Sequence, residues 1–263
     1  MAALTGEHAV NYDARGLAEP LADVPRVSEL DGETAVFDAH DLTTRQINLE
    51  LRWLLYEQGV KDVTVRNPGA KHSLGVGILT RCRITFEGSL GYFGCGLIDG
   101  PEIHVQGRVG WSACENMMSG VVVIDGNAGS LTGAAFRGGD VLVRGRVGAR
   151  TGIDQKGGTV IVLGDAGSMT GFMMQRGRQI ILGDVGPGLG DSMYDGEFYI
   201  GGKVKALGVD CVPGEWTDAD TEFIARKFAI YELGEPPPLQ KFVCGKRLYN
   251  YDNLEPSERK LVL

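Results

Sequence analysis

The chain has 263 residues, and its 34 Asp and Glu against 26 Lys and Arg give a formal net charge of −8. This acidic balance argues against nucleic acid as a partner, because phosphate binding needs a basic surface. The sequence has no apolar run of about 18 residues, and its N-terminus lacks a basic segment followed by an apolar one, so neither a membrane span nor an export signal is predicted. We therefore expect a soluble, cytoplasmic protein.

Residues 1–60 are predicted to form an extended lead-in followed by a capping helix. A short strand is expected at residues 35–37, and residues 43–58 have the apolar spacing of one helical face. Asp41 or Thr43 suits the N-cap of this helix, and Gly59 suits its end. The apolar face comprises Ile47, Leu51, Leu54 and Leu55.

Residues 61–212 contain an internal repeat with a step of 19 residues, in which glycine recurs in four columns. The first column extends from Gly69 to Gly202, and the others begin at Gly91, Gly120 and Gly133. A period of this size is typical of stacked supersecondary units, here about eight of them. The structural glycines at the centre of the first column are Gly88, Gly107, Gly126, Gly145, Gly164 and Gly183.

Each copy of the repeat predicts a short strand with one buried face. Apolar residues stand four and two positions before each glycine of the first column, as Val141 and Val143 do before Gly145. No copy contains a segment of helical length, so a copy buries its apolar face only by stacking on its neighbours. We expect a parallel β-helix with one coil per repeat, a spacing of about 4.8 Å between coils and a length of roughly 40 Å.

The outward position of these strands changes from polar to apolar along the repeat, and an outward apolar stripe needs a cover. Two covers are compatible with the sequence: a terminal segment of the same chain, or a partner subunit. The outward column reads Thr85, His104, Val123, Leu142, Ile161, Ile180 and Tyr199. The candidate partner interface is Leu142, Ile161, Leu163, Ile180, Leu182 and Tyr199.

Residues 213–263 depart from the repeat and are predicted to form a helix and a proline-linked tail. Thr217 suits the N-cap of a helix from Asp218 to about Leu233. The three prolines at 236–238 force an extended linker, and the aromatic residues after it are expected to dock on the rod or on a neighbouring subunit.

The sequence shows no arrangement of residues typical of a catalytic or metal centre, and no catalytic, cofactor-binding or metal-binding residue is predicted in this chain. His72 and His104 are interpreted as surface residues, and Cys95 and Cys114 as small residues at a tight bend. A local basic cluster fits either solvated positions of the solenoid or a docking site for an acidic partner. This cluster comprises Arg137, Arg144, Arg146, Arg150, Lys156, Arg176 and Arg178.

Residues 138–143 and 157–162, with Gly145–Arg150 between them, resemble the glycine-repeat C-terminal domain of the glutamate synthase large subunit. The segment 41–47 is similar to the entry into that domain. The resemblance covers roughly residues 36–212 and implies a right-handed β-helix without catalytic residues. In that family the domain holds an amidotransferase domain and an FMN synthase domain together.

A free-standing domain of this kind resembles the middle subunit of three-subunit relatives, best known from N-methylglutamate synthase (methylamine–glutamate N-methyltransferase). The resemblance implies a hetero-oligomer with an amidotransferase-like subunit and an FMN and iron–sulfur subunit, which forms N-methylglutamate and ammonia from methylamine and L-glutamate. Alternatives are the glycine-repeat subunit of formylmethanofuran dehydrogenase and a structural homo-oligomer. A hexapeptide-repeat acyltransferase or a γ-type carbonic anhydrase fits less well, because a step of 19 is not a multiple of six.

Overall fold

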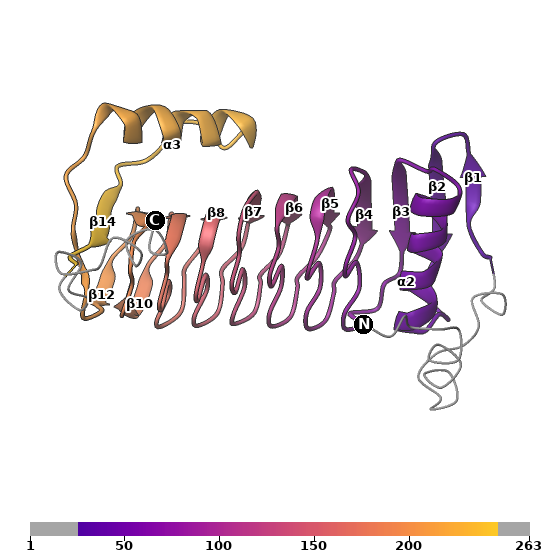
Figure 1. The fold of residues 1–263 in the computed structure, drawn as a ribbon, viewed down its shortest axis with the longest axis horizontal. Coiled ribbons are helices and arrows are strands. Elements are labelled where there is room, and N and C mark those ends of the chain that lie inside the picture. The colour runs from indigo at the N-terminus through magenta and orange to yellow at the C-terminus, as the bar shows by residue number, and fades with distance from the viewer. Residues whose placement is uncertain (1–25, 247–263) are drawn as a thin grey trace, which may run out of the picture.

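A computed structural model describes residues 26–246, which form a β-solenoid with a helix over each of two surfaces (Figure 1). The predicted parallel β-helix is confirmed. Residues 1–25 and 247–263, which hold most of the predicted lead-in and the end of the predicted tail, lie outside the described residues.

One sheet contains most of the strands, and nine of its strands are parallel, from β2 to β9 and β11. The elements up to β7 are β1 (Glu29–Asp31), β2 (Thr34–Asp38), α2 (Thr44–Arg52), β3 (Asp62–Arg66), β4 (Arg83–Glu87), β5 (Asp99–Val105), β6 (Ser119–Ile124) and β7 (Asp140–Val143). The later elements are β8 (Lys156–Val162), β9 (Arg176–Ile181), β10 (Val185–Leu189), β11 (Glu197–Ile200), β12 (Val204–Leu207), β13 (Cys211–Pro213), α3 (Asp218–Ile230) and β14 (Gln240–Cys244).

The strand register reproduces the 19-residue step from β4 onward. Ile84 pairs with Ile103, and Val141 pairs with Val160, so like residues lie above like. The inward side chains of these strands are buried and join one core cluster that runs from Ala35 to Cys244. Because each coil covers the apolar face of the next, this core is continuous along the rod.

The solenoid begins one coil earlier than the sequence predicts. β2 pairs in parallel with β3 at a step of 28 residues, and β3 pairs with β4 at a step of 21. The longer steps hide the period, because the first of these connections contains α2. The column of Gly88 consequently continues to Asn67 rather than to Gly69, which belongs to the following turn. The boundaries expected at residues 60 and 212 cut across this sheet and its core.

The first glycine column lies where successive main chains approach closely. A Cβ atom added to Gly126 would lie 2.9 Å from the carbonyl oxygen of Gly107, and one added to Gly164 would lie equally near that of Gly145. The column of Gly139 has positive φ as well, +87° at Gly139 itself. Glycine is therefore required there by both the turn and the contact.

Cys95 and Cys114 occupy the tight bend that the sequence predicts for them. Their φ angles of 58° and 57° are left-handed, like that of Gly133 in the same column of the next coil. Both side chains are buried, and burial raises the pKa of the Cys95 thiol to about 12. All five cysteines of the chain are free thiols.

α2 closes the N-terminal end of the rod, as predicted. Thr43 is its N-cap and forms a capping box with Gln46, and a π-helical turn over Trp53–Glu57 continues it. Ile47, Leu51, Leu54 and Leu55 are buried in the solenoid core. The chain then leaves the helix through Gly59, whose φ is +70°.

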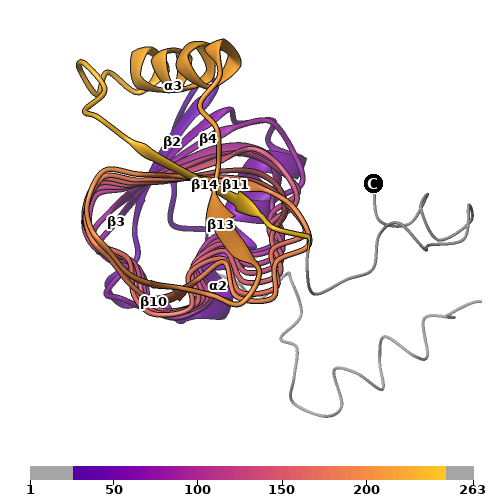
Figure 2. The ribbon, with the colours of Figure 1, turned by 90° about the vertical axis from the view of Figure 1, so that its left-hand side faces the viewer.

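The C-terminal strands close the other end of the rod. β14 pairs antiparallel with β11, and β13 pairs antiparallel with β14, so the sheet ends in strands that reverse direction. Figure 2 looks onto this end and shows β13 and β14 crossing it in front of the superposed coils. The proline-linked segment thus docks on its own rod up to Cys244.

α3 lies outside the coils along the outward face of the sheet (Figures 1 and 2) and covers the apolar stripe. Phe223, Ile224 and Phe228 of this helix are buried against it. Of the two covers that the sequence allows, the structure has the segment of the same chain, so the stripe is wrong as a candidate partner interface. In this cluster Leu142, Ile161, Ile180 and Tyr199 are fully buried, and Leu163 and Leu182 are partly buried.

The outward face that α3 leaves open is polar, as the sequence predicts for the early coils. Arg83 forms ion pairs with Asp62 and Glu102 in the two adjacent coils, at 3.4 and 3.6 Å. His104 and Arg144 both contact Asp125. This half of the face is solvated and needs no cover.

Gly139→Ala should destabilise the rod through both the φ angle and the contact, because the new Cβ would overlap the carbonyl oxygen of Gly120. Gly234→Ala is the matched control, since Gly234 has a φ of +79° and nothing within 4 Å of a built Cβ. We expect the free energy of unfolding of Gly139→Ala to fall below that of the control by about 1–3 kcal/mol. Equal free energies of unfolding for the two variants in denaturant titrations would show that the contact between coils adds nothing to the cost of the substitution.

Phe228→Ala should loosen α3 from the stripe while the coils stay folded. The buried ring is lost from a cluster separate from the solenoid core, and such truncations cost about 3–5 kcal/mol. We expect faster hydrogen exchange in residues 218–230 and unchanged exchange in β4–β8. The control is Ile230→Ala on the same helix, whose side chain is 58% exposed and which should leave the helix protected.

Candidate binding groove

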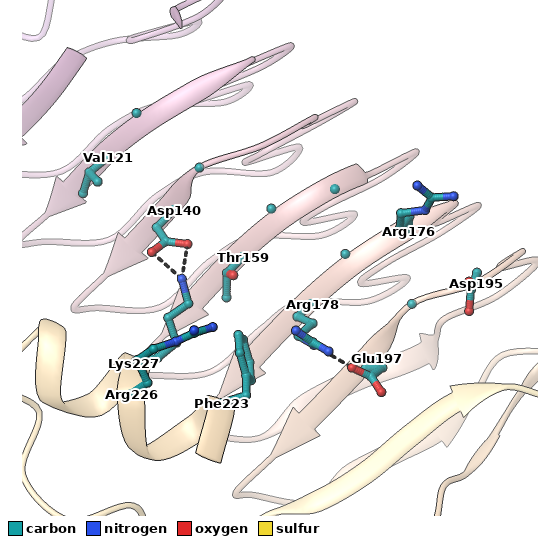
Figure 3. A pocket seen from close by; sticks show the side chains of 16 residues that line it. Val121, Asp140, Thr159, Arg176, Arg178, Asp195, Glu197, Phe223, Arg226 and Lys227 are labelled. Carbon is teal, nitrogen blue, oxygen red and sulfur yellow. Dashed lines mark hydrogen bonds and ion pairs between the residues drawn. The ribbon is translucent and has the colours of Figure 1, made fainter. Parts of the chain in front are cut away.

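An open groove of about 860 Å³ runs between α3 and the edge of the sheet, across five coils (Figure 3). Glycines form its floor, and polar side chains of the sheet and the helix form its walls. Its side chains come from Val121, Asp140, Thr159, Arg176, Arg178, Asp195, Glu197, Phe223, Arg226 and Lys227.

The floor of the groove exists because the coils need glycine there. Gly120, Gly139, Gly158, Gly177 and Gly196 are one column of the repeat, and all have positive φ. A Cβ at Gly158 would lie 2.7 Å from the carbonyl oxygen of Gly139. The turn and the stacking of main chains thus leave a strip of backbone without side chains beside α3.

The Asp140 carboxylate binds the C-terminal half of α3. Its two oxygens each accept a hydrogen bond of 2.6 Å from Lys227 Nζ, and Oδ2 also accepts one of 2.6 Å from the Tyr231 hydroxyl. Burial and the bond to Asp140 raise the pKa of Tyr231. Lys227 is therefore engaged within the protein.

The middle of α3 contacts the sheet through Phe223. The Arg178 guanidinium lies 4.3 Å from the centroid of the Phe223 ring, and Lys227 Nζ lies 5.8 Å from it. Arg178 also donates from Nε to Glu197 at 2.6 Å. Cation–π contact and ion pairing together fix the Arg178 side chain.

The N-terminal end of α3 is held through its own Asp220. Tyr199 donates to Asp220 at 2.6 Å, and Lys241 of β14 contacts both Asp220 and Glu197. Burial acts to raise the pKa of Asp220, but hydrogen bonds from Lys241, Tyr199 and Thr217 outweigh it and hold this pKa well below its usual range. The pKa of Glu197 is also lowered, because hydrogen bonds from Arg178 and Lys241 outweigh its burial.

Arg176 and Arg226 differ from the other two cations of the groove. Both are exposed, and neither forms an ion pair with a carboxylate among residues 26–246. Figure 3 shows Arg226 on α3 and Arg176 on the far side of the groove. Two guanidinium groups flanking a backbone floor are able to bind an anionic group.

The structure divides the basic cluster that the sequence brings together. Lys156 pairs with Asp154, and Arg178 pairs with Glu197. Arg146 and Arg150 are exposed and do not line the groove. The clustering of basic residues in the sequence therefore does not predict the groove, because one wall of the groove is α3, which is distant in the chain.

The predicted surface histidines each have a local partner. His72 Nδ1 accepts a hydrogen bond from the Tyr92 main-chain N–H, and His104 Nε2 lies 2.9 Å from Asp125. Within the described part of the chain, no group of three or more His, Cys, Asp or Glu side chains is placed to hold a metal ion. No helix of residues 26–246 has the length and apolarity to cross a bilayer.

An exposed aromatic ladder was not recognised from the sequence. His72, Tyr92 and Trp111 stack on successive turns, with ring centroids 4.6 and 5.5 Å apart. Tyr92 is 51% exposed and Trp111 is 56% exposed. The sequence does contain a signal for the ladder, because residues 92 and 111 are one 19-residue step apart and therefore fall in the same column of the repeat.

Comparison of the chain with models of protein families and with curated proteins finds no match.

Acidification should loosen α3 through Asp220. Its pKa is lower in the folded protein than the ordinary 3.8, so its stabilising contribution is complete above that value and is lost as pH falls through the lower, folded-state pKa. We expect hydrogen-exchange protection of residues 218–230 to be constant from about pH 7 to about pH 5 and to fall below about pH 4.

Asp220→Asn should flatten this acid dependence, whereas Asp218→Asn in the same helical turn should retain it. Asp218 is exposed and is the matched control for the loss of one carboxylate at the helix N-terminus. Protection in the unmodified chain that stays level down to about pH 2 would contradict the role of the Asp220 network.

Proposed function

We propose that this chain is a non-catalytic scaffold subunit of a glutamate-synthase-like complex. Its partners would be an amidotransferase-like subunit and a synthase subunit that carries FMN and an iron–sulfur cluster, and the complex would work in the cytoplasm. The proposal rests on the resemblance of residues 36–212 to the glycine-repeat domain, and N-methylglutamate synthase is the relative that it favours.

The observation that supports a scaffold best is a preformed rod with an exposed aromatic ladder. α2 and β13–β14 close its ends, and α3 covers its apolar stripe, so the rod needs no further subunit to bury its core. The ladder of His72, Tyr92 and Trp111 remains exposed when the ends and the stripe are covered. Tyr and Trp are enriched at the centres of protein interfaces, where large amphipathic rings bury much area.

The stacked rings are suited to a protein partner because their geometry is fixed. The Tyr92 and Trp111 planes are inclined by only 18°, and His72 and Tyr92 by 22°. Tyr92 therefore presents an edge between two stacked neighbours, while His72 and Trp111 are each stacked against Tyr92. Ordering these side chains on binding would cost little conformational entropy.

The complex itself tests the proposal. The tagged full-length chain, purified from the cell that produces it, should bring two further polypeptides and the visible absorbance of a flavin. Methylamine- and glutamate-dependent formation of N-methylglutamate would identify the complex. A colourless protein recovered only with itself would overturn the proposal in favour of a structural homo-oligomer, and a molybdenum or tungsten partner would favour the formylmethanofuran dehydrogenase alternative.

Trp111→Ala should weaken association with a partner subunit by about tenfold or more, as expected for a central aromatic contact. The ring is exposed in the isolated chain, so the melting temperature should change little. Val209→Ala, at a side chain that is 70% exposed near the other end of the rod, is the control. Co-purification that is equally strong for both variants would exclude the ladder as the partner surface.

A further inference from the structure

The groove beside α3 has more cations than carboxylates in its lining, although the protein as a whole is acidic. Four cations and three carboxylates line it, whereas the whole chain has a formal net charge of −8. Asp140 and Glu197 are neutralised by Lys227 and Arg178, which leaves Arg176 and Arg226 against one carboxylate, Asp195. The groove thus has an excess of one positive charge, whereas the chain as a whole is acidic.

The shape of the groove selects an extended chain rather than a small ligand. It spans the five glycines from Gly120 to Gly196, which at about 4.8 Å per coil is roughly 20 Å. This length accommodates about six residues of extended polypeptide. Pockets for small molecules are mostly enclosed and apolar, whereas this groove is open and largely polar.

The floor also suits a polypeptide. Because the glycine column has no side chains, a bound main chain can lie directly on the backbone of the coils. Thr159 and Phe223 line the path as well, but both side chains are almost wholly buried, so the exposed arginines provide the main side-chain contacts. Nucleic acid fits poorly, since three carboxylates line the groove and phosphate binding needs a denser positive charge.

We propose that this groove binds an extended acidic segment of a partner subunit, held by Arg176 on one side and Arg226 on the other. The inference takes its partner from the proposed scaffold role. It assigns the acidic segment a site that is separate from the aromatic ladder, since none of the ladder residues lines the groove.

A fluorescein-labelled oligoglutamate peptide is the probe, with oligoglutamine of the same length as the neutral control, and binding is followed by fluorescence anisotropy on the full chain. We expect oligoglutamate to bind and oligoglutamine not to bind. The double variant Arg176→Glu/Arg226→Glu should weaken oligoglutamate binding by about tenfold or more, because two attractive contacts become repulsive.

Arg146→Glu/Arg150→Glu is the matched control, since it makes the same change in net charge at exposed arginines outside the groove. It should retain the affinity of the unmodified chain, and thermal melts should show both variants folded. Equal weakening in both variants, or no binding of oligoglutamate to the unmodified chain, would overturn the inference. Neither result would alter co-purification of the subunits, which tests the scaffold role separately.

Discussion

The close stacking of main chains at the glycine columns is the constraint on which the rest of this structure depends. Gly126 and Gly164 face the carbonyl oxygens of the coils before them at distances that a Cβ would violate. Because the coils can approach this closely, the strands from β4 to β9 pair at a 19-residue step, apart from a register shift near the start of β5 and of β8, and like side chains stack along the rod. A stack of apolar outward residues then becomes a stripe, and a stack of glycines becomes the floor of a groove.

The stripe determines the place of α3, and α3 in turn creates the groove. The helix covers the stripe with Phe223, Ile224 and Phe228, and a carboxylate-centred cluster of contacts fixes it near each end. Asp140 binds Lys227 and Tyr231, while Asp220 binds Tyr199 and Lys241. With α3 held in this way, the apolar stripe is closed to partners, and the aromatic ladder and the groove are the surfaces that we assign to them.

Several elements could be predicted from local patterns because their causes are local. Thr43 and Thr217 are both N-caps with capping boxes, and the apolar face of α2 is buried as its spacing predicts. The first parallel pair, β2 with β3, was missed because α2 interrupts the period between them. The groove could not be predicted from the sequence, because Arg226 reaches it only through the docking of α3. Whether each neighbouring arginine forms an ion pair depends on which carboxylate the adjacent coil supplies.

By itself the sequence determined the solenoid, its 19-residue step and the need to cover an outward apolar stripe, because periodic glycine and β-branched residues impose these features copy by copy. Only the tertiary structure decided what covers the stripe, since a helix of the same chain and a partner subunit satisfy the same apolar pattern. It also decided which charges are neutralised: Lys227 of α3 meets Asp140 of the sheet, and Arg178 pairs with Glu197 of the adjacent strand, whereas Arg176 and Arg226 are exposed. The pairing of Lys227 with Asp140 depends on the docking of α3, which no linear spacing contains.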